Sequence, residues 1–253
     1  MELGLTGKVA AVAASSRGLG KAVALELVRE GARVAICSRG GDMLAAAERE
    51  LIGAAANGRA QVVAVACDLD SRDGPRTLVK AAVERWERLD VLVANNGGPP
   101  PGRVAAQDER SWHAAFERTF MATARLVAEA IPHLERAAAE PDGFARIVML
   151  TSSAVREPLE ELALSNTMRS AVSALMKTLS REVASRGITV NQVCPGRIDT
   201  DRLREIDLAR ARAQGHSPEE VRRNTEQTIP IGRYGRPAEL AAVVAFLCSA
   251  KSS

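Results

Sequence analysis

The chain has 253 residues, a formal net charge of +3, 46% hydrophobic residues and 26% charged residues. A chain of this composition can bury a large core, which excludes an intrinsically disordered protein. The arginines alternate with acidic residues in stretches such as "AAAERELIG", a pattern typical of solvated helix faces. We therefore expect no nucleic-acid partner.

The sequence also lacks the signals of a membrane, secreted or metal-binding protein. No stretch holds the roughly 18 apolar residues that a membrane span needs, and "MELGLTGKVAAV" has no basic start followed by a long apolar run. The four cysteines form no CxxC motif, and the three histidines show no metal-ligand spacing. We expect a cytoplasmic protein with no membrane partner and no metal.

Six short apolar runs predict the strands of a sheet. They are apolar almost throughout, which is typical of parallel strands that are buried on both faces. In chain order they cover 8–14, 32–38, 61–67, 90–96, 146–152 and 188–194.

Longer segments between these runs have apolar residues three and four positions apart, which predicts helices. One begins at Gly18, and the others cover 42–55, 75–88, 109–138 and 164–186. Such alternation favours right-handed crossovers between parallel strands. The fold class is therefore α/β: a single domain over residues 1–253, with one Rossmann-type, doubly wound parallel sheet and helices on both faces.

Two segments follow the last predicted strand. Residues 199–228 are polar and lie outside the strand pattern, so we expect them to form a helical substrate flap over the carboxyl edge of the sheet. A final helix is expected from Pro237 to about Cys248.

The first crossover has the composition of a phosphate-binding turn. "AVAASSRGLGKAVALEL" joins a strand, a turn of small residues and a helix, and Gly18 and Gly20 allow the backbone to approach a ligand closely. The helix that follows offers free N–H groups and a positive dipole end to a pyrophosphate. In doubly wound folds this crossover is where nucleotides bind.

The end of the second predicted strand favours NADP over NAD. Proteins that select NAD often place an acid there to bind the ribose 2′-hydroxyl. Here "AICSRG" supplies Ser38 and Arg39 and no acid, and Arg17 lies in the phosphate turn. Two arginines suit a 2′-phosphate, which accepts charge-assisted hydrogen bonds.

Together these motifs resemble the short-chain dehydrogenase/reductase family over nearly the whole chain, and within it proteins labelled 3-oxoacyl carrier-protein reductase. The motifs that carry the resemblance are "SSRGLG", with Ala14 where the family has its leading glycine, "CDLD", "LVANNGG", "MLTSS", "NQVCPGRIDT" and "IPIGRYGRPAELAAVVAFLCS". The resemblance implies a cofactor site formed by Ala14, Ser16, Arg17, Gly18, Leu19, Gly20, Ser38, Arg39, Asp68, Leu69, Asn95, Asn96, Gly97, Gly98, Arg169, Pro195, Gly196, Ile198 and Thr200.

The catalytic positions depart from this family. Its serine corresponds to Ser152, but the tyrosine thirteen residues later and the lysine four beyond it are Ser165 and Arg169 here. The asparagine of the family's proton relay corresponds to Thr119. The single tyrosine, Tyr234, lies far along the chain, so no shift of the alignment restores the pattern.

These replacements change the chemistry more than the geometry. Positions 165 and 169 still share one helix face. A serine hydroxyl is a much weaker acid than a tyrosine with a pKa near 10, and arginine stays protonated, so it cannot transfer a proton. Glu157, Glu160 and Glu161, in the loop before Ser165, are alternative proton donors if burial raises their pKa values.

Three functions remain open at this stage. The first is an NADP-dependent oxidoreductase that acts on a small-molecule carbonyl or alcohol, in which Ser152 polarises the carbonyl, Arg169 holds the nicotinamide ribose and Ser165 is a weak proton donor. The second is a catalytically silent NADP(H)-binding sensor or scaffold. The third is dehydration or isomerisation on the same fold. We expect a homodimer, with a homotetramer as the alternative, formed through helices near 109–135 and 155–183.

Overall fold

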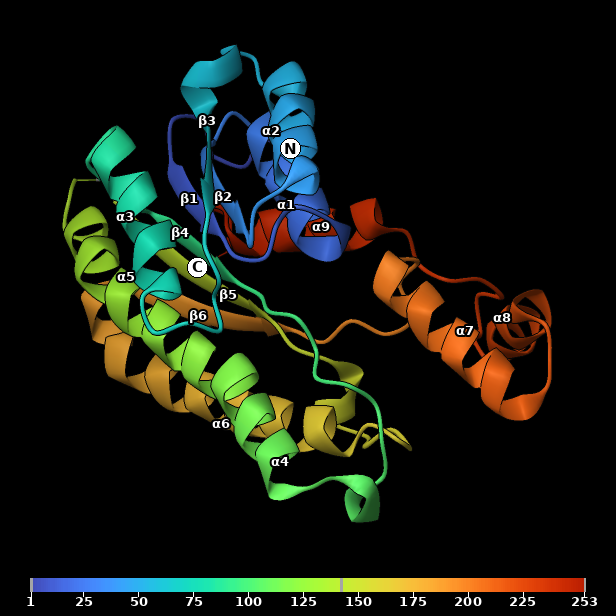
Figure 1. Ribbon diagram of the computed structural model, residues 1–253. Coiled ribbons are helices and arrows are strands. Elements are labelled where there is room, and N and C mark those ends of the chain that lie inside the picture. The colour runs from blue at the N-terminus through green and yellow to red at the C-terminus, as the bar shows by residue number, and fades with distance from the viewer. Residues whose placement is uncertain (1, 142, 253) are drawn as a thin grey trace.

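Six parallel strands form one sheet in the computed structural model, which describes residues 2–141 and 143–252 (Figure 1). The strands are β1 (Val9–Val12), β2 (Arg33–Ser38), β3 (Val62–Ala66), β4 (Val91–Ala94), β5 (Ala145–Leu150) and β6 (Ile188–Val193). Their order in the sheet is β3-β2-β1-β4-β5-β6, and each neighbouring pair is parallel. The predicted strands and the doubly wound fold class are confirmed.

The strand order reverses between β1 and β4. From β1 the chain builds outward through β2 to β3, and it then returns to place β4 on the other side of β1. The loops that leave the carboxyl ends of β1 and β4 therefore diverge to opposite faces of the sheet. This divergence leaves a crevice outside the carboxyl ends of the strands, and open α/β sheets bind their ligands in crevices of this kind.

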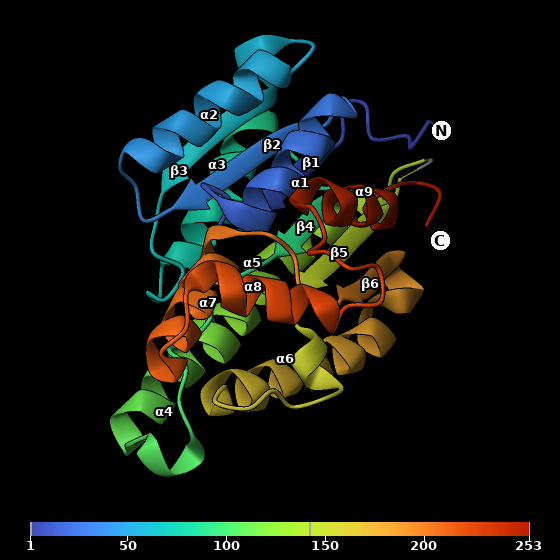
Figure 2. The same ribbon diagram turned by 90° about the vertical axis from the view of Figure 1, so that its right-hand side faces the viewer.

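Helices cover both faces of the sheet (Figures 1 and 2). The helices α1 (Gly18–Arg29), α2 (Asp42–Ala54) and α9 (Pro237–Leu247) pack in one hydrophobic cluster. The helices α3 (Gly74–Trp86), α5 (Ala122–Ala138) and α6 (Ala163–Val183) pack in a second cluster on the other face. Successive residues of β1 alternate between the clusters, Val9 facing the second and Ala10 the first, because side chains alternate across a strand.

The predicted helix over 109–138 is continuous but not uniform. It comprises α4 (Glu109–Ala115), a π-helical segment (Phe116–Met121) and α5. Phe116 and Phe120, four residues apart in the π-helical segment, stack with ring centroids 5.3 Å apart. A π-helical segment adds a residue to a turn and is often found at functional sites.

The polar segment 199–228 contains two helices, α7 (Asp201–Gln214) and α8 (Pro218–Gln227). Both lie apart from the helical layers, at one end of the sheet (Figures 1 and 2). Their N-termini are capped by the Thr200 and Ser217 hydroxyls, which accept hydrogen bonds from Leu203 N and Glu220 N. Few residues of these helices are buried, which agrees with the polarity of the sequence.

The described residues include no helix that is both long enough and apolar enough to cross a membrane.

Candidate active site

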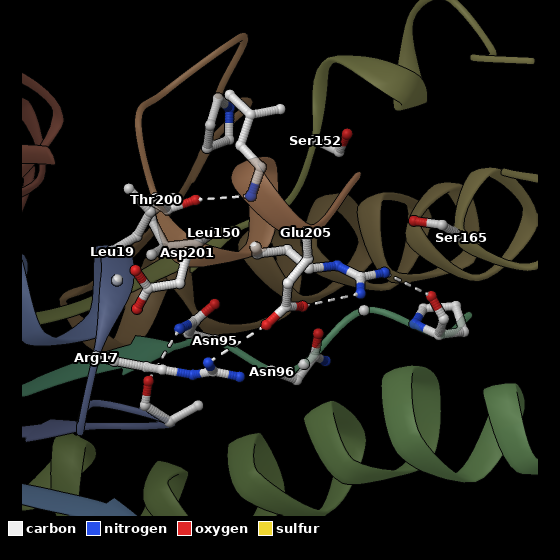
Figure 3. A pocket seen from close by; sticks show the side chains of 18 of the residues that line it. Arg17, Leu19, Asn95, Asn96, Leu150, Ser152, Ser165, Thr200, Asp201 and Glu205 are labelled. Atoms are coloured by element: carbon white, nitrogen blue, oxygen red, sulfur yellow. Dashed lines mark hydrogen bonds and ion pairs between the residues drawn. The ribbon is translucent and has the colours of Figure 1, made fainter. Parts of the chain in front are cut away.

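A cavity of about 540 Å³ lies at the carboxyl end of the sheet, between the strand ends and α7 (Figure 3). This volume is within the usual range for small-molecule sites, about 300–1,000 Å³. The predicted site residues that line it are Ala14, Ser16, Arg17, Gly18, Leu19, Ser38, Arg39, Asp68, Leu69, Asn95, Asn96, Gly97, Gly98, Ser152, Ser165, Arg169, Pro195, Gly196, Ile198 and Thr200. Two other predicted residues, Gly20 and Thr119, are not in its lining.

Gly20 shapes the phosphate turn from behind. A Cβ at Gly20 would lie 2.4 Å from the backbone oxygen of Ala14, so only glycine lets α1 pack this closely against the turn. Gly18 has φ +57°, in the left-handed region that favours glycine. Ala14 also has a left-handed backbone, with φ +49°, and is therefore strained at the position where the resembling family has glycine.

One end of the cavity lies at the carboxyl ends of β2 and β3. Ser38 is half-buried and its Oγ accepts a hydrogen bond from Gly40 N at 3.3 Å, while Arg39 is exposed. Arg39 forms no ion pair with any residue that the structure describes. Asp68 and Leu69, which follow β3, complete this end. The guanidinium of Arg39 is therefore free to bind an anion.

The other end lies where β4 and β5 finish, and it holds the serines. Ser152 Oγ accepts a hydrogen bond from Ala154 N at 3.2 Å, which leaves the hydroxyl proton available for donation. Ser165 is half-buried, and its side chain extends from α6 into the cavity (Figure 3). Its hydroxyl forms no hydrogen bond within the described parts of the chain.

Arg169 lies one helical turn beyond Ser165 and faces the same cavity. Its Nη1 donates hydrogen bonds to the backbone oxygens of Leu150, at 3.3 Å, and Thr151, at 3.2 Å. Burial, together with the like charge of Arg202, lowers the pKa of Arg169 to about 10. The guanidinium therefore remains charged at neutral pH and cannot deliver a proton.

Thr119 is fully buried in the π-helical segment behind the cavity. Its Oγ1 has no hydrogen-bond partner, whereas its backbone oxygen accepts hydrogen bonds from Asn96 Nδ2 at 3.0 Å and Thr123 Oγ1 at 2.7 Å. The contribution of this residue to the cavity is thus to hold Asn96, through the backbone rather than the side chain.

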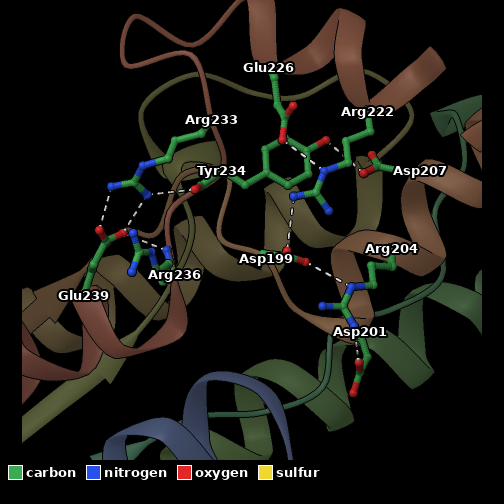
Figure 4. Close-up of polar contacts among 10 residues, drawn as sticks. All are labelled: Asp199, Asp201, Arg204, Asp207, Arg222, Glu226, Arg233, Tyr234, Arg236 and Glu239. Carbon is green, nitrogen blue, oxygen red and sulfur yellow. Dashed lines mark hydrogen bonds and ion pairs between the residues drawn. The ribbon is translucent and has the colours of Figure 1, made fainter. Parts of the chain in front are cut away.

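Tyr234 is in a separate polar cluster between α7, α8 and the segment before α9 (Figure 4). Its hydroxyl donates a 2.8 Å hydrogen bond to Asp207, and the Arg222 guanidinium lies 4.8 Å from its ring centroid. Burial and the bond to Asp207 raise the pKa of Tyr234. Tyr234 does not line the cavity and therefore cannot replace the missing tyrosine.

The alternative proton donors are also outside the cavity. Glu157, Glu160 and Glu161 are exposed, and none of them is in the lining. None of the three carboxyl groups is therefore placed to donate a proton to a substrate in the cavity.

Several cavity residues were missed by sequence reasoning, and one group of them belongs to α7 or its approach. They include Arg197, Arg202, Glu205, Ile206 and Arg210. Glu205 forms ion pairs with Arg17, at 3.5 Å, and with Arg202, at 3.7 Å, and so joins α7 to the phosphate turn (Figure 3). The spacing of these charges in the sequence is that of any solvated helix, so no local signal could have identified them.

The strand order, the phosphate turn and the serine-lined cavity define a doubly wound α/β protein of the dinucleotide-binding type. A family model described as enoyl-(acyl carrier protein) reductase matches residues 13–253. This chain belongs to the short-chain dehydrogenase/reductase family.

Three relatives illustrate the range of this similarity. The rhamnolipids biosynthesis 3-oxoacyl-[acyl-carrier-protein] reductase of Pseudomonas aeruginosa is 30% identical, over 96% of this chain and 90% of the relative. The L-sorbose reductase of Gluconobacter frateurii, solved with NADPH and L-sorbose, superposes with a TM-score of 0.90 at 27% identity, covering 100% of this chain and 93% of that one. A short-chain oxidoreductase from Pseudomonas aeruginosa PAO1, solved with NADPH and described as containing an atypical catalytic center, has a TM-score of 0.83 at 28% identity, covering 97% and 91%.

Proposed function

We propose that this protein is an NADP(H)-dependent oxidoreductase that interconverts a carbonyl and an alcohol on a small molecule. The observation that carries the proposal is one continuous cavity lined both by the phosphate turn, with Arg17 and Gly18, and by Ser152, Ser165 and Arg169. A cofactor bound along the strand ends and a substrate beside the serines would therefore share one space.

The residues present fit NADP better than NAD. Arg39 has no carboxylate partner among the described residues, and no acid ends β2, so a 2′-phosphate would meet a free guanidinium rather than a repelling carboxylate. The N-terminus of α1 would bind the pyrophosphate. The related enzymes solved with NADPH support the same choice for this chain.

Each residue of the serine end has a separate task in the proposed reaction. When bound, NADPH supplies the hydride. Ser152 would donate its hydroxyl proton in a hydrogen bond to the substrate carbonyl oxygen and polarise it. Arg169 has N–H groups beyond the Nη1 bonds to the backbone, and these would hold the nicotinamide ribose. Ser165 would hydrogen-bond a water molecule or the carbonyl oxygen, as a weak proton donor.

A catalytically silent NADP(H)-binding protein is the second candidate. It is favoured by one observation: the cavity lining contains no tyrosine and no lysine among the residues that the structure describes. Cofactor binding is common to both candidates, and turnover separates them.

The test is a calorimetric titration with NADPH and NADH, followed by a turnover assay with NADPH and a panel of ketones and aldehydes. NADPH binding with turnover supports the oxidoreductase. NADPH binding without turnover supports the sensor or scaffold. Absence of NADPH binding by the folded protein contradicts both.

We also propose that the chain is a single domain, 1–253, in which residues 199–228 form the substrate flap. We further propose that the protein is cytoplasmic and forms a homodimer through residues 109–135 and 155–183. Phe116, in the first of these segments, is 39% exposed and large enough to contribute to such an interface. Light scattering at micromolar concentration should give the mass of a dimer, and a monomer would contradict the proposal.

A further inference from the structure

The cavity is lined by more positive than negative side chains, and part of the positive charge lies at the serine end. Seven arginines line it against four carboxylates, so an anion entering the cavity is electrostatically favoured. The arginines are Arg17, Arg39, Arg118, Arg169, Arg197, Arg202 and Arg210, and the carboxylates are Asp68, Asp70, Asp201 and Glu205.

Some of this charge is already paired. Arg118 binds Asp70 at 2.8 Å, and Arg17 lies 3.5 Å from Glu205. Arg169 is different, because it has no carboxylate partner among residues 2–141 and 143–252, and the like charge of Arg202 contributes to lowering its pKa. A half-buried guanidinium beside a second guanidinium is unfavourable unless an anion joins them.

Arg169 and Arg202 approach one point from different elements. Arg169 comes from α6 and Arg202 from the first turn of α7, and both reach Gly98, which follows β4. A Cβ at Gly98 would lie 3.7 Å from Arg202 Nη2 and 3.9 Å from Arg169 Nη2. The absence of a side chain at Gly98 therefore leaves room for a small group between the two guanidinium groups.

The geometry of Arg202 prepares it for such a group. Its Nη2 donates a 3.0 Å hydrogen bond to the backbone oxygen of Pro99, which directs the guanidinium toward the cavity. Its ion pair with Glu205 is long, at 3.7 Å, and both side chains are about half exposed, so water and salt weaken that pair. An incoming anion can compete with it.

The pair lies at the substrate end of the cavity. Arg169 hydrogen-bonds Leu150, the last residue of β5, and Thr151, which precedes Ser152. It also shares a helix face with Ser165. The phosphate turn and Arg39 instead follow β1 and β2, on the other side of β4. An anion between Arg169 and Arg202 is therefore not the cofactor's pyrophosphate or 2′-phosphate.

We propose that Arg202 and the Nη2 group of Arg169 bind a carboxylate of the substrate, which makes the substrate an oxo acid or the corresponding hydroxy acid. The Nε–H of Arg169 is then the donor left for the nicotinamide ribose. A carboxylate is planar and small, and its two oxygens can accept hydrogen bonds from two guanidinium groups at once. This inference rests on the proposed function, since it specifies the substrate class of the same cavity.

The test measures binding separately from turnover. NADPH-saturated protein is titrated by calorimetry with 2-oxohexanoate and 5-oxohexanoate, each compared with its methyl ester, which keeps the carbonyl and removes the charge. Each acid that fits should bind roughly 10- to 100-fold more tightly than its ester, because hydrogen bonds to charged groups are among the strongest in proteins. Hexyl phosphate is the control for a phosphate-bearing ligand.

Two variants and one matched control locate the effect. Arg202→Gln should remove most of the preference for the acid and leave ester binding within about threefold. Gly98→Ala should weaken acid binding without changing any charge. The control, Arg204→Gln, removes the same charge from the same helix. Arg204 is not in the cavity lining and pairs with Asp199 and Asp201, so the preference should persist.

The outcomes separate this inference from the proposed function. Equal binding of acids and esters, or equal losses in Arg202→Gln and Arg204→Gln, would overturn the carboxylate site. Tighter binding of hexyl phosphate than of either acid would also overturn it. Tight acid binding without oxidation of NADPH supports the carboxylate site and contradicts the oxidoreductase. Turnover of neutral ketones without a preference for acids supports the oxidoreductase and contradicts the carboxylate site.

Discussion

Introducing a tyrosine at position 165 and a lysine at position 169 should speed the reduction of an activated neutral ketone. Ser165 extends into the cavity with an unpaired hydroxyl, so a phenol there would reach the space in which the carbonyl oxygen is proposed to bind. General acid catalysis by a positioned side chain contributes about 10²–10⁴ in rate. We expect a gain of about 10² for the double variant Ser165→Tyr with Arg169→Lys.

The same change has a cost in stability that can be estimated from the contacts of Arg169. Its Nη1 bonds to the oxygens of Leu150 and Thr151 would be lost or replaced by one bond from the lysine ammonium. A net hydrogen bond is worth about 1 kcal/mol, so the free energy of unfolding should fall by about 1–2 kcal/mol. The tyrosine ring itself enters the cavity rather than the packed core, which limits overpacking.

The assay follows the loss of NADPH absorbance, with NADPH affinity and urea unfolding measured on the same samples. The rate of the double variant should fall as pH rises through the pKa of the new phenol, because only the protonated phenol can act as an acid. The wild type has no cavity phenol among its described residues and should lack this step. A folded, NADPH-binding double variant with no gain in rate would refute the view that proton delivery limits this site.

Three further changes test other parts of the structure. Arg39→Ala should weaken NADPH binding about 10-fold and change NADH binding little, because the exposed guanidinium is proposed to contact the 2′-phosphate; equal losses for both cofactors in calorimetry would contradict this. Ala14→Gly should raise the free energy of unfolding by about 1 kcal/mol, since φ +49° strains alanine but not glycine, and a lower urea midpoint would contradict it. Tyr234→Phe should lower the free energy of unfolding by about 2 kcal/mol, because the buried Asp207 carboxylate loses its hydrogen bond while its Oδ1 already has none. NADPH affinity should stay unchanged in that variant, and a loss would show that Tyr234 supports the cofactor site.

The arrangement of strands and helices could be predicted because its causes are local. Buried parallel strands need nearly continuous apolar runs, and helices that cover a sheet need an apolar stripe, so both patterns are visible in the sequence. The phosphate turn was recognisable for the same reason, since Gly18 and Gly20 meet backbone requirements within a few residues of the chain. The sequence did not reveal the π-helical segment at Phe116–Met121, which differs from an α-helix by one residue in a turn.

The sequence by itself determined that position 165 is a serine and position 169 an arginine. It therefore also determined that the tyrosine–lysine pair of the short-chain dehydrogenase/reductase family is absent. Only the tertiary structure decided what surrounds them. The charges of α7 follow an ordinary surface pattern, and they become cavity residues because the chain leaves β6 and folds α7 over the strand ends. The convergence of Arg169 and Arg202 on Gly98 joins three elements that are far apart in the chain. Contacts of this kind depend on packing and on the electrostatics of the whole fold, and no local pattern of residues encodes them.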